Sequence, residues 1–483
     1  MKHLISFILC IAIICVSFTL SVAEELNVFQ SGAYSYVLNE EGNAIITNHQ
    51  EGEEKLILPS SLDGYTVTGI GKEAFYNDHF IKELVIPGCI KTIDDSAFAY
   101  TNHIRSVVLE SGVERIGKEA FLYCQIYELT LPDTLVSLGD RAFACNNISS
   151  VQLPDSIQEI GINPFDICER LSVIVVSPDH PVLAVLDGVL FSKEDKRLVC
   201  KPLGLEIKEY HVPKGIRFIG ERSFLGDETL AVVAIPGSVE SVGSFAFEEC
   251  VGLSAVTIEE GPKEIGEWAY ARCSDLSQIT IPGSVTKIGD KCFYDCSGLR
   301  DVNLSKGLES IGDEAFDGCI ALTKIDLPNS VKEIVNNPFV NCERLRTIGV
   351  AKGNKSYKVV DGVLFTADMK KLICYPLASK GNQYVIPKGV EVIGEGSFYS
   401  CNQMISIEMP DSVRSIEKTA FAFCENLREI NIPETAAEIG EKVFLGCDSL
   451  VSIKVARESV AADYCRVNAL SYTYQDSDDW LNN

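Results

Sequence analysis

An aromatic residue recurs about every 23 residues along most of this chain, and this period limits the possible folds more than any other feature. The 14 anchors are Phe75, Phe98, Phe121, Phe143, Phe165, Phe224, Phe247, Tyr270, Phe293, Phe316, Phe339, Phe398, Phe421 and Phe444. A unit of this length cannot bury its own apolar face, so neighbouring copies must stack on one another. The sequence therefore predicts a solenoid.

One copy, residues 276–296 (LSQITIPGSVTKIGDKCFYDC), shows how each coil is expected to fold. Leu, Ile and Ile alternate with polar residues over 276–281, which predicts a strand with one buried face. Pro282-Gly283 ends that strand, and Val285 and Ile288 point inward again. We expect residues 289–296 to form a short helical turn that buries its aromatic and cysteine side chains.

The same pattern recurs at 322–331 (LTKIDLPNSV) and at 416–424 (IEKTAFAFC). It resembles the BspA-like leucine-rich repeat, L-x-x-I-x-I-P-x-S-V-x-x-I-G-x-x-A-F-x-x-C, over roughly residues 56–455. The resemblance implies an α/β repeat solenoid, with a parallel sheet on one face and short helical turns on the other. It also implies a bacterial surface or secreted protein engaged in adhesion to host or neighbouring-cell proteins.

The N-terminus has the features of a signal peptide: Lys2, an apolar run over 4–20, and Ser21-Val22-Ala23 before Glu24. An uncleaved anchor is the alternative. The mature chain has no second apolar run of about 18 residues and is expected to be soluble. The expected organisation is a signal peptide at 1–23, a β-hairpin cap at 24–55, repeat blocks at 56–168, 213–342 and 387–455, irregular islands at 169–212 and 343–386, a helix–strand cap at 456–474 and a disordered tail at 475–483.

The two islands match each other at a separation of 174 residues, for example at 187–191 and 361–365 (DGVLF in both). This match indicates that a large block was duplicated. In each island, two apolar runs flank a polar turn and predict a β-hairpin. The charged tips at 193–196 and 367–370 are either solvated turns, which we favour, or protruding binding loops.

Eighteen cysteines would normally suggest disulfides in an exported protein, but their spacing argues against pairing. Eleven follow the aromatic anchor: Cys124, Cys145, Cys168, Cys250, Cys273, Cys296, Cys319, Cys342, Cys401, Cys424 and Cys447. Other copies have Asp78, Thr101 or Asp227 at this position, which no bridge could use. We predict a column of buried free thiols. Cys292 and Cys296 supply too few ligands for a metal.

Charge and motifs narrow the possible functions. The formal net charge is −26, which disfavours nucleic acid and anionic lipid as partners. The chain lacks a Gly-x-Ser-x-Gly elbow, a phosphate-binding loop, a dinucleotide fingerprint and histidine pairs at ligand spacing. We therefore expect a protein that binds rather than catalyses, without a cofactor or a metal.

The outward positions of the predicted strands are the candidate binding surface, because alternate side chains leave the core. The expected ligand-facing residues are Thr257, Gln278, Thr280, Asp301, Asn303, Lys324 and Asp326. These columns contain no aromatic residue, which favours weak, extended contact with a large protein over a tight interface.

Two alternatives to adhesion remain: a structural envelope or matrix protein that self-associates, and a carbohydrate-binding protein. The latter needs aromatic rings to stack on sugars. The only candidates are Tyr34, Tyr36, Tyr472 and Tyr474 in the caps, and their expected role is to pack within the cap cores.

Overall fold

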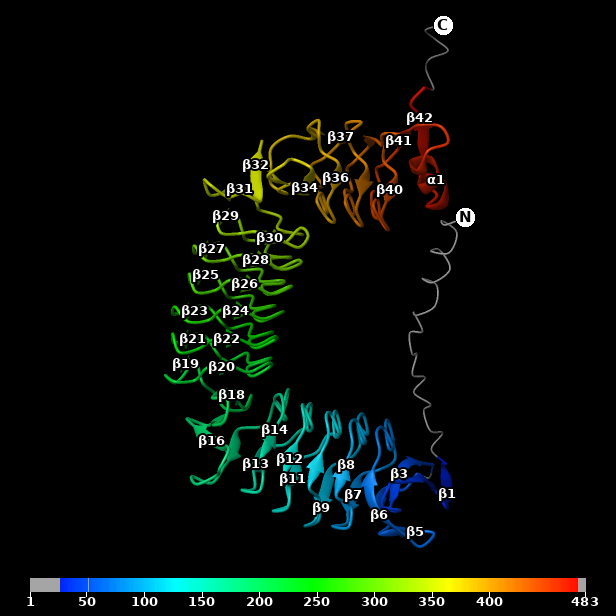
Figure 1. Cartoon of the computed structure of the whole chain (residues 1–483), viewed down its shortest axis with the longest axis vertical. Helices are drawn as coiled ribbons and strands as arrows, with labels where there is room; N and C mark the ends of the chain where they lie inside the picture. Colours follow the sequence, from blue (N-terminus) through cyan, green and yellow to red (C-terminus); the bar gives the residue numbers. More distant parts are fainter. Residues whose placement is uncertain (1–26, 51, 477–483) are drawn as a thin grey trace, which may run out of the picture.

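A computed structural model describes residues 27–50 and 52–476 of the chain. The predicted signal peptide and residues 477–483 of the predicted tail lie outside these ranges. The coils stack into a wide, C-shaped arc, and both ends of the arc lie on the same side of the molecule (Figure 1). Each regular coil contains a strand of three or four residues, a turn, a strand of two residues and a second turn.

The longer strands form parallel sheets along the outer side of the arc (Figure 1). Their burial alternates, as β25 shows, because successive side chains point to opposite faces. Strands one repeat apart pair in register, so that Gln278 lies opposite Asp301. The strands are β4 (Lys55–Ile57), β7 (Glu83–Ile86), β9 (Ser106–Leu109), β11 (Glu128–Thr130), β13 (Ser150–Gln152), β15 (Val173–Val175), β19 (Glu209–His211), β21 (Val232–Ile235), β23 (Ala255–Ile258), β25 (Gln278–Ile281), β27 (Asp301–Leu304), β29 (Lys324–Leu327), β31 (Thr347–Val350), β35 (Gln383–Val385), β37 (Ser406–Glu408), β39 (Glu429–Asn431) and β41 (Ser452–Val455).

The two-residue strands form a second set of parallel ladders, on the side of the coil toward the inside of the arc (Figure 1). In each strand the second residue is an aliphatic that points into the core, as Ile288 does beside exposed Lys287. They are β8 (Thr92–Ile93), β10 (Arg115–Ile116), β12 (Ser137–Leu138), β14 (Glu159–Ile160), β20 (Phe218–Ile219), β22 (Ser241–Val242), β24 (Glu264–Ile265), β26 (Lys287–Ile288), β28 (Ser310–Ile311), β30 (Glu333–Ile334), β36 (Val392–Ile393), β38 (Ser415–Ile416) and β40 (Glu438–Ile439).

The expected helical turns are wrong: within the described residues, the segments that carry the aromatic anchors are hydrogen-bonded turns, not helices. In one such turn segment, Lys291 and Asp295 have φ of 52° and 56°, a left-handed conformation that interrupts a right-handed helix. The amides of Lys291, Phe293 and Asp295 instead donate to the next coil, to Asp313, Ala315 and Asp317 at 2.8, 2.8 and 2.6 Å. The turn segments therefore form a third inter-coil ladder.

The core contains a column of stacked rings and a column of thiols. Phe293 lies 5.5 Å from Tyr270 and 5.2 Å from Phe316, measured between ring centroids, with nearly parallel planes. The Cys296 thiol donates to the Tyr270 carbonyl at 3.0 Å, and the equivalent bond recurs in most other copies. All 16 cysteines within the described ranges are free, as predicted.

One cysteine was assigned to the wrong position. Cys145 is half-buried beside the thiol column, and Asn146 takes the place in that column. The Asn146 amide nitrogen donates to the Phe121 carbonyl at 2.8 Å, the role that a thiol has elsewhere. In this copy an amide nitrogen therefore replaces the thiol as the hydrogen-bond donor.

Each block begins with three antiparallel strands that lead into its second sheet. At the N-terminus these are β1 (Phe29–Ser31), β2 (Tyr34–Leu38) and β3 (Ala44–His49), followed by β5 (Ser61–Leu62) and β6 (Tyr65–Ile70). In the islands they are β16 (Leu183–Leu186), β17 (Val189–Ser192), β18 (Arg197–Cys200), and β32 (Tyr357–Val360), β33 (Val363–Thr366), β34 (Lys371–Cys374). The predicted hairpins β17–β18 and β33–β34 are confirmed, and a third strand joins each.

The islands divide the interior into three apolar cores. In β17, Leu190 packs into the core of the first block, whereas Val189 and Phe191 pack into that of the second. Leu364 of β33 belongs to the second core, and Phe365 to the third. Each hairpin is thus buried on both faces, which explains why its sequence is a continuous apolar run.

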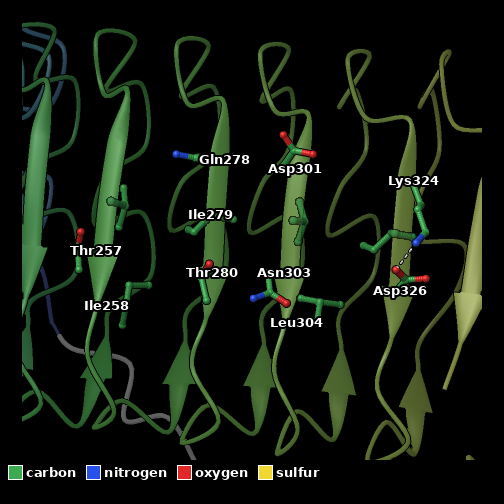
Figure 2. Close-up of a pocket in the computed structure, with 13 residues that line it drawn as sticks. Thr257, Ile258, Gln278, Ile279, Thr280, Asp301, Asn303, Leu304, Lys324 and Asp326 are labelled. Atoms are coloured by element: carbon green, nitrogen blue, oxygen red, sulfur yellow. Dashed lines mark ion pairs between the residues drawn. The ribbon is translucent and has the colours of Figure 1, made fainter. Parts of the chain in front are cut away.

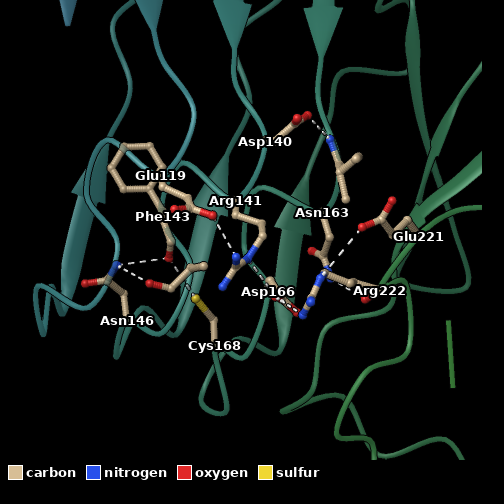
Figure 3. Close-up of polar contacts among 12 residues, drawn as sticks. Glu119, Asp140, Arg141, Phe143, Asn146, Asn163, Asp166, Cys168, Glu221 and Arg222 are labelled. Carbon is tan, nitrogen blue, oxygen red and sulfur yellow. Dashed lines mark hydrogen bonds and ion pairs between the residues drawn. The ribbon is translucent and has the colours of Figure 1, made fainter. Parts of the chain in front are cut away.

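The aromatic column skips the island at each junction. The Asn163 side chain donates to the Arg222 carbonyl at 2.7 Å, across 59 residues, and Asn337 bonds equivalently to Gly396 at 2.7 Å. Figure 3 shows buried Asp166 between the guanidinium groups of Arg141 and Arg222, at 3.1 and 3.5 Å. Polar contacts therefore join the blocks at the turn segments.

The chain ends in a helix and a strand. α1 (Val460–Val467) begins at Ser459, whose hydroxyl accepts the Ala462 amide, and its buried side contains Ala461 and Cys465. β42 (Tyr472–Tyr474) adds a parallel strand to β41. Within the predicted tail, the Gln475 amide donates to the Val455 carbonyl at 2.9 Å.

Candidate functional site

All seven side chains that the sequence singled out are exposed and surround one open groove of about 660 Å³ on the outer sheet. We call this depression the strand-face groove (Figure 2). It crosses four neighbouring coils, β23, β25, β27 and β29. Its lining residues are Val256, Thr257, Ile258, Gln278, Ile279, Thr280, Asp301, Val302, Asn303, Leu304, Lys324, Ile325 and Asp326.

The register of the strands places these side chains in two rows. Gln278 lies beside Asp301, and Thr280 beside Asn303, because β25 and β27 pair without offset. β23, β25–β27 and β29 belong to three separately hydrogen-bonded sheets, so the groove lies where the outer sheet is interrupted twice. The residues that alternate with these along each strand, such as Ile279 between Gln278 and Thr280, are buried and anchor the strand in the core.

The electrostatics of the groove are modest. The Lys324 ammonium lies 2.6 Å from the Asp326 carboxylate on the same strand, and both side chains are more than half exposed. A pair this exposed contributes little stability. For Asp301, no ion pair occurs within the part of the chain that the structure describes. The groove therefore offers amide and hydroxyl groups and one unpaired carboxylate for hydrogen bonding.

A smaller depression of about 360 Å³ occupies the same face of the third block. Its lining includes outward side chains of β37, β39 and β41, namely Ser406, Glu408, Glu429, Asn431 and Lys454. A polar hollow on the outer sheet thus occurs in both the second and the third block.

Neither depression brings together a catalytic set of residues. Within residues 27–50 and 52–476 there is no group of three or more His, Cys, Asp or Glu that could hold a metal ion. Strongly raised pKa values belong mainly to buried groups, such as the Cys296 thiol at about 12, where burial disfavours the charged form. Among the described residues, no helix is both long and apolar enough to cross a membrane.

The island tips are short turns held by local bonds. The Lys193 ammonium donates to the His180 carbonyl at 2.6 Å, and Asp195 pairs with Arg197 at 2.9 Å. In the second island, Asp368 accepts from the Thr366 hydroxyl at 2.6 Å. These contacts fit the interpretation of the tips as solvated turns.

Sequence reasoning missed the exposed aromatic residues of the turn segments. The prediction that aromatic candidates lie only in the caps is wrong, because Tyr76, Tyr100 and Tyr123 are exposed on three successive coils. In the second block, the half-buried Phe245 and Trp268 rings stack at 6.3 Å, and the Tyr294 ring is tilted against Trp268 at 5.0 Å. Arg272 contacts both Trp268 and Tyr294.

Among the cap tyrosines, Tyr36 is buried, and its hydroxyl donates to Asp63 at 2.9 Å. The signal that could have found the exposed rings is their position, one or two residues from the anchor, where the chain turns at the surface.

Comparison with solved structures finds other solenoids of this kind. A leucine-rich repeat protein from Eubacterium ventriosum has a TM-score of 0.52 and 20% identity, over 81% of this chain and 92% of its own. A leucine-rich repeat protein from Bacteroides ovatus has a TM-score of 0.42 and 21% identity, over 92% and 99%. A leucine rich cell surface protein from Faecalibacterium prausnitzii has a TM-score of 0.44 and 23% identity, over 94% and 97%. The first likeness shows the shared fold.

None of the curated proteins compared with this chain matches it. Its repeats, in contrast, match the model of a known family. The BspA type leucine rich repeat region, with 6 copies, matches residues 68–183, 204–300, 272–360 and 375–472. These segments cover more than half of the chain and include every strand of the strand-face groove. The chain belongs to the BspA-type leucine-rich repeat family.

Proposed function

We propose that this chain is a non-catalytic, exported protein that binds other proteins, in adhesion to host or neighbouring cells, through the strand-face groove. One observation carries the proposal: seven exposed polar side chains from four neighbouring strands surround an open groove on the outer face of the solenoid. Membership of a repeat family used for protein interaction supports it.

The groove fits an extended polypeptide better than a small molecule. It is open, it runs across four neighbouring strands, and its amide and hydroxyl groups can hydrogen-bond a peptide backbone at successive coils. Exposed Asp301 supplies one charge for a basic side chain of the partner. Without a ring in the groove, each contact is weak and affinity depends on length.

Export is supported by the leader-like sequence at residues 1–23 and is compatible with free thiols. Oxidation requires the thiolate, and burial raises the pKa of Cys168 to about 12. The antiparallel strands β1–β3 and the α1–β42 unit act as caps in this proposal, because they cover the ends of the stacked core. The Ser459 N-cap and the Tyr36–Asp63 bond help to hold these units in place.

The test measures binding of residues 24–483, at physiological salt, to surfaces coated with purified matrix proteins, glycans or whole cells. We expect a saturable protein signal that weakens severalfold in the triple variant Gln278→Ala, Asn303→Ala, Lys324→Ala. Gln152→Ala is the matched control, since Gln152 is exposed at the equivalent column on β13, outside the groove. A signal unchanged in the triple variant would contradict the proposal. Absence of binding combined with self-assembly in light scattering would favour a structural role.

A further inference from the structure

Three exposed tyrosines form a ladder on the turn segments of the first three coils. Tyr76, Tyr100 and Tyr123 are 50%, 41% and 52% exposed. The Tyr76 and Tyr100 rings meet edge to face at 5.4 Å, and Tyr100 stacks on Tyr123 at 6.0 Å. We call this set the tyrosine ladder. Phe80, four residues after Tyr76, is 60% exposed. Single exposed rings are ordinary, whereas a contiguous row marks an interaction site.

The backbone holds the ladder rigidly. The Tyr100 amide donates to the Leu122 carbonyl at 2.7 Å, and the Tyr123 amide to the Ala144 carbonyl at 3.0 Å. Both residues have φ of 62°, a conformation that a bulky side chain adopts only when the surrounding structure imposes it. Because the rings are already ordered by stacking, a partner loses little side-chain entropy when it binds them.

The turn segments that carry the ladder contain few charged residues between flanking ones such as Glu73, Arg105 and Glu119, although 23% of the chain is charged. The segments 74–80, 97–104 and 120–127 contain no Lys or Arg and a single carboxylate, Asp78. Asp78 lies 3.6 Å from the His49 ring, and its side chain is 12% exposed. In the second block, each equivalent segment contains a charged residue, such as Glu249 or Arg272. Few charges and many aromatic residues are the composition of the buried centre of a protein interface.

The geometry points to the tyrosine ladder as a second protein-docking surface, separate from the strand-face groove, whose partner is a folded protein other than this chain with an uncharged contact surface. A second copy is disfavoured, since two chains that each carry a formal charge of −26 repel one another. A glycan is disfavoured because sugars stack on ring faces, and the Tyr100 and Tyr123 faces cover each other. The inference goes beyond the proposed function, because it places the strong contacts on another side of the coil.

The test selects binders to residues 24–483 from an unbiased library of displayed single-domain proteins. The affinity of each selected clone is then measured for the unaltered chain and for each variant. We expect most clones to bind Tyr100→Asn and Tyr123→Asn more than about tenfold more weakly, because rings at interface centres are typical hot spots. Asn tolerates the left-handed conformation at these positions. Tyr76→Ser, at a position with ordinary φ, gives the same readout if an Asn variant fails to fold.

Phe423→Asn is the matched control. Phe423 has φ of 58°, is 36% exposed and lies at the equivalent position of a late coil. Clones that bind all variants equally, or that are lost only with Gln278→Ala, would overturn the ladder as a docking surface. Self-association in light scattering, or binding on a glycan array, that disappears with Tyr100→Asn would replace the proposed partner with a second copy or a glycan.

Discussion

Replacing Phe316 by alanine empties a site at the centre of the second core. The ring is fully buried and stacks between Phe293 at 5.2 Å and Phe339 at 5.8 Å. The inter-coil hydrogen bonds keep the neighbouring coils apart, so the cavity cannot close. Loss of a buried phenylalanine side chain then costs about 3–5 kcal/mol.

Because each coil contacts only its neighbours, this cost should appear locally. The island hairpins separate the cores, so the effect should end at β17–β18 on one side and β33–β34 on the other. Native-state hydrogen exchange, followed by mass spectrometry of peptides, measures it. We expect protection around Phe293, Phe316 and Phe339 to fall by about 140- to 3700-fold, at tenfold per 1.4 kcal/mol.

Phe316→Leu is the control, because it retains most of the volume and should lower protection much less. Equal loosening of all three blocks in Phe316→Ala would refute the nearest-neighbour reasoning. So would unchanged exchange near Phe316, which would mean that the coils collapse around the cavity.

Three further predictions concern stability. Lys201→Met leaves the Asp227 carboxylate buried without the ammonium that lies 2.8 Å away, and the free energy of unfolding in urea should fall by about 3–5 kcal/mol. The double variant Lys201→Tyr, Asp227→Cys introduces the residues found at the same positions of the second junction, Tyr375 and Cys401, and should recover most of this loss. An equal loss in both variants would contradict the prediction. Burial raises the pKa of Asp317 to about 7, so its protonation stabilises the fold fully below about pH 4, and this contribution is lost as pH rises through 7. Asp317→Asn should therefore reduce the pH dependence of the urea unfolding midpoint between pH 4 and 8. An unchanged pH dependence would be evidence against this role of Asp317. The buried thiols should react with a thiol reagent far faster in denaturant than in the native chain. A reductant should leave the melting temperature unchanged, and a lower melting temperature in reductant would reveal disulfides.

Much of the fold was predictable because the period places equivalent residues in register. The alternation over Gln278–Ile281 predicted the outer strands and their exposed side. The second sheet escaped prediction because Lys287–Ile288 buries only one side chain, too few for an alternation. The turn segments were predicted as helical because Phe293 and Cys296 have helical spacing. Left-handed residues such as Lys291 are not glycines and leave no sequence signal.

The exposure of the seven candidate side chains was predictable to the same extent. Outward alternation identified these seven of the 13 residues that line the groove, whereas the hollow itself depends on how neighbouring sheets separate. Cys145 was misplaced because it lies two residues after its anchor Phe143, whereas the thiols of the column lie three residues after theirs. The tyrosine ladder was missed because exposure beside the anchor depends on the turn conformation at Tyr100 and Tyr123.

The most direct test of protein binding is hydrogen exchange of residues 24–483 with and without the protein that gives the strongest saturable signal. The proposal predicts slower exchange in peptides that cover β23 to β29, whereas β13 and β15, on the same sheet face outside the groove, stay unchanged. Slower exchange elsewhere with β23 to β29 unaffected would contradict binding at the strand-face groove.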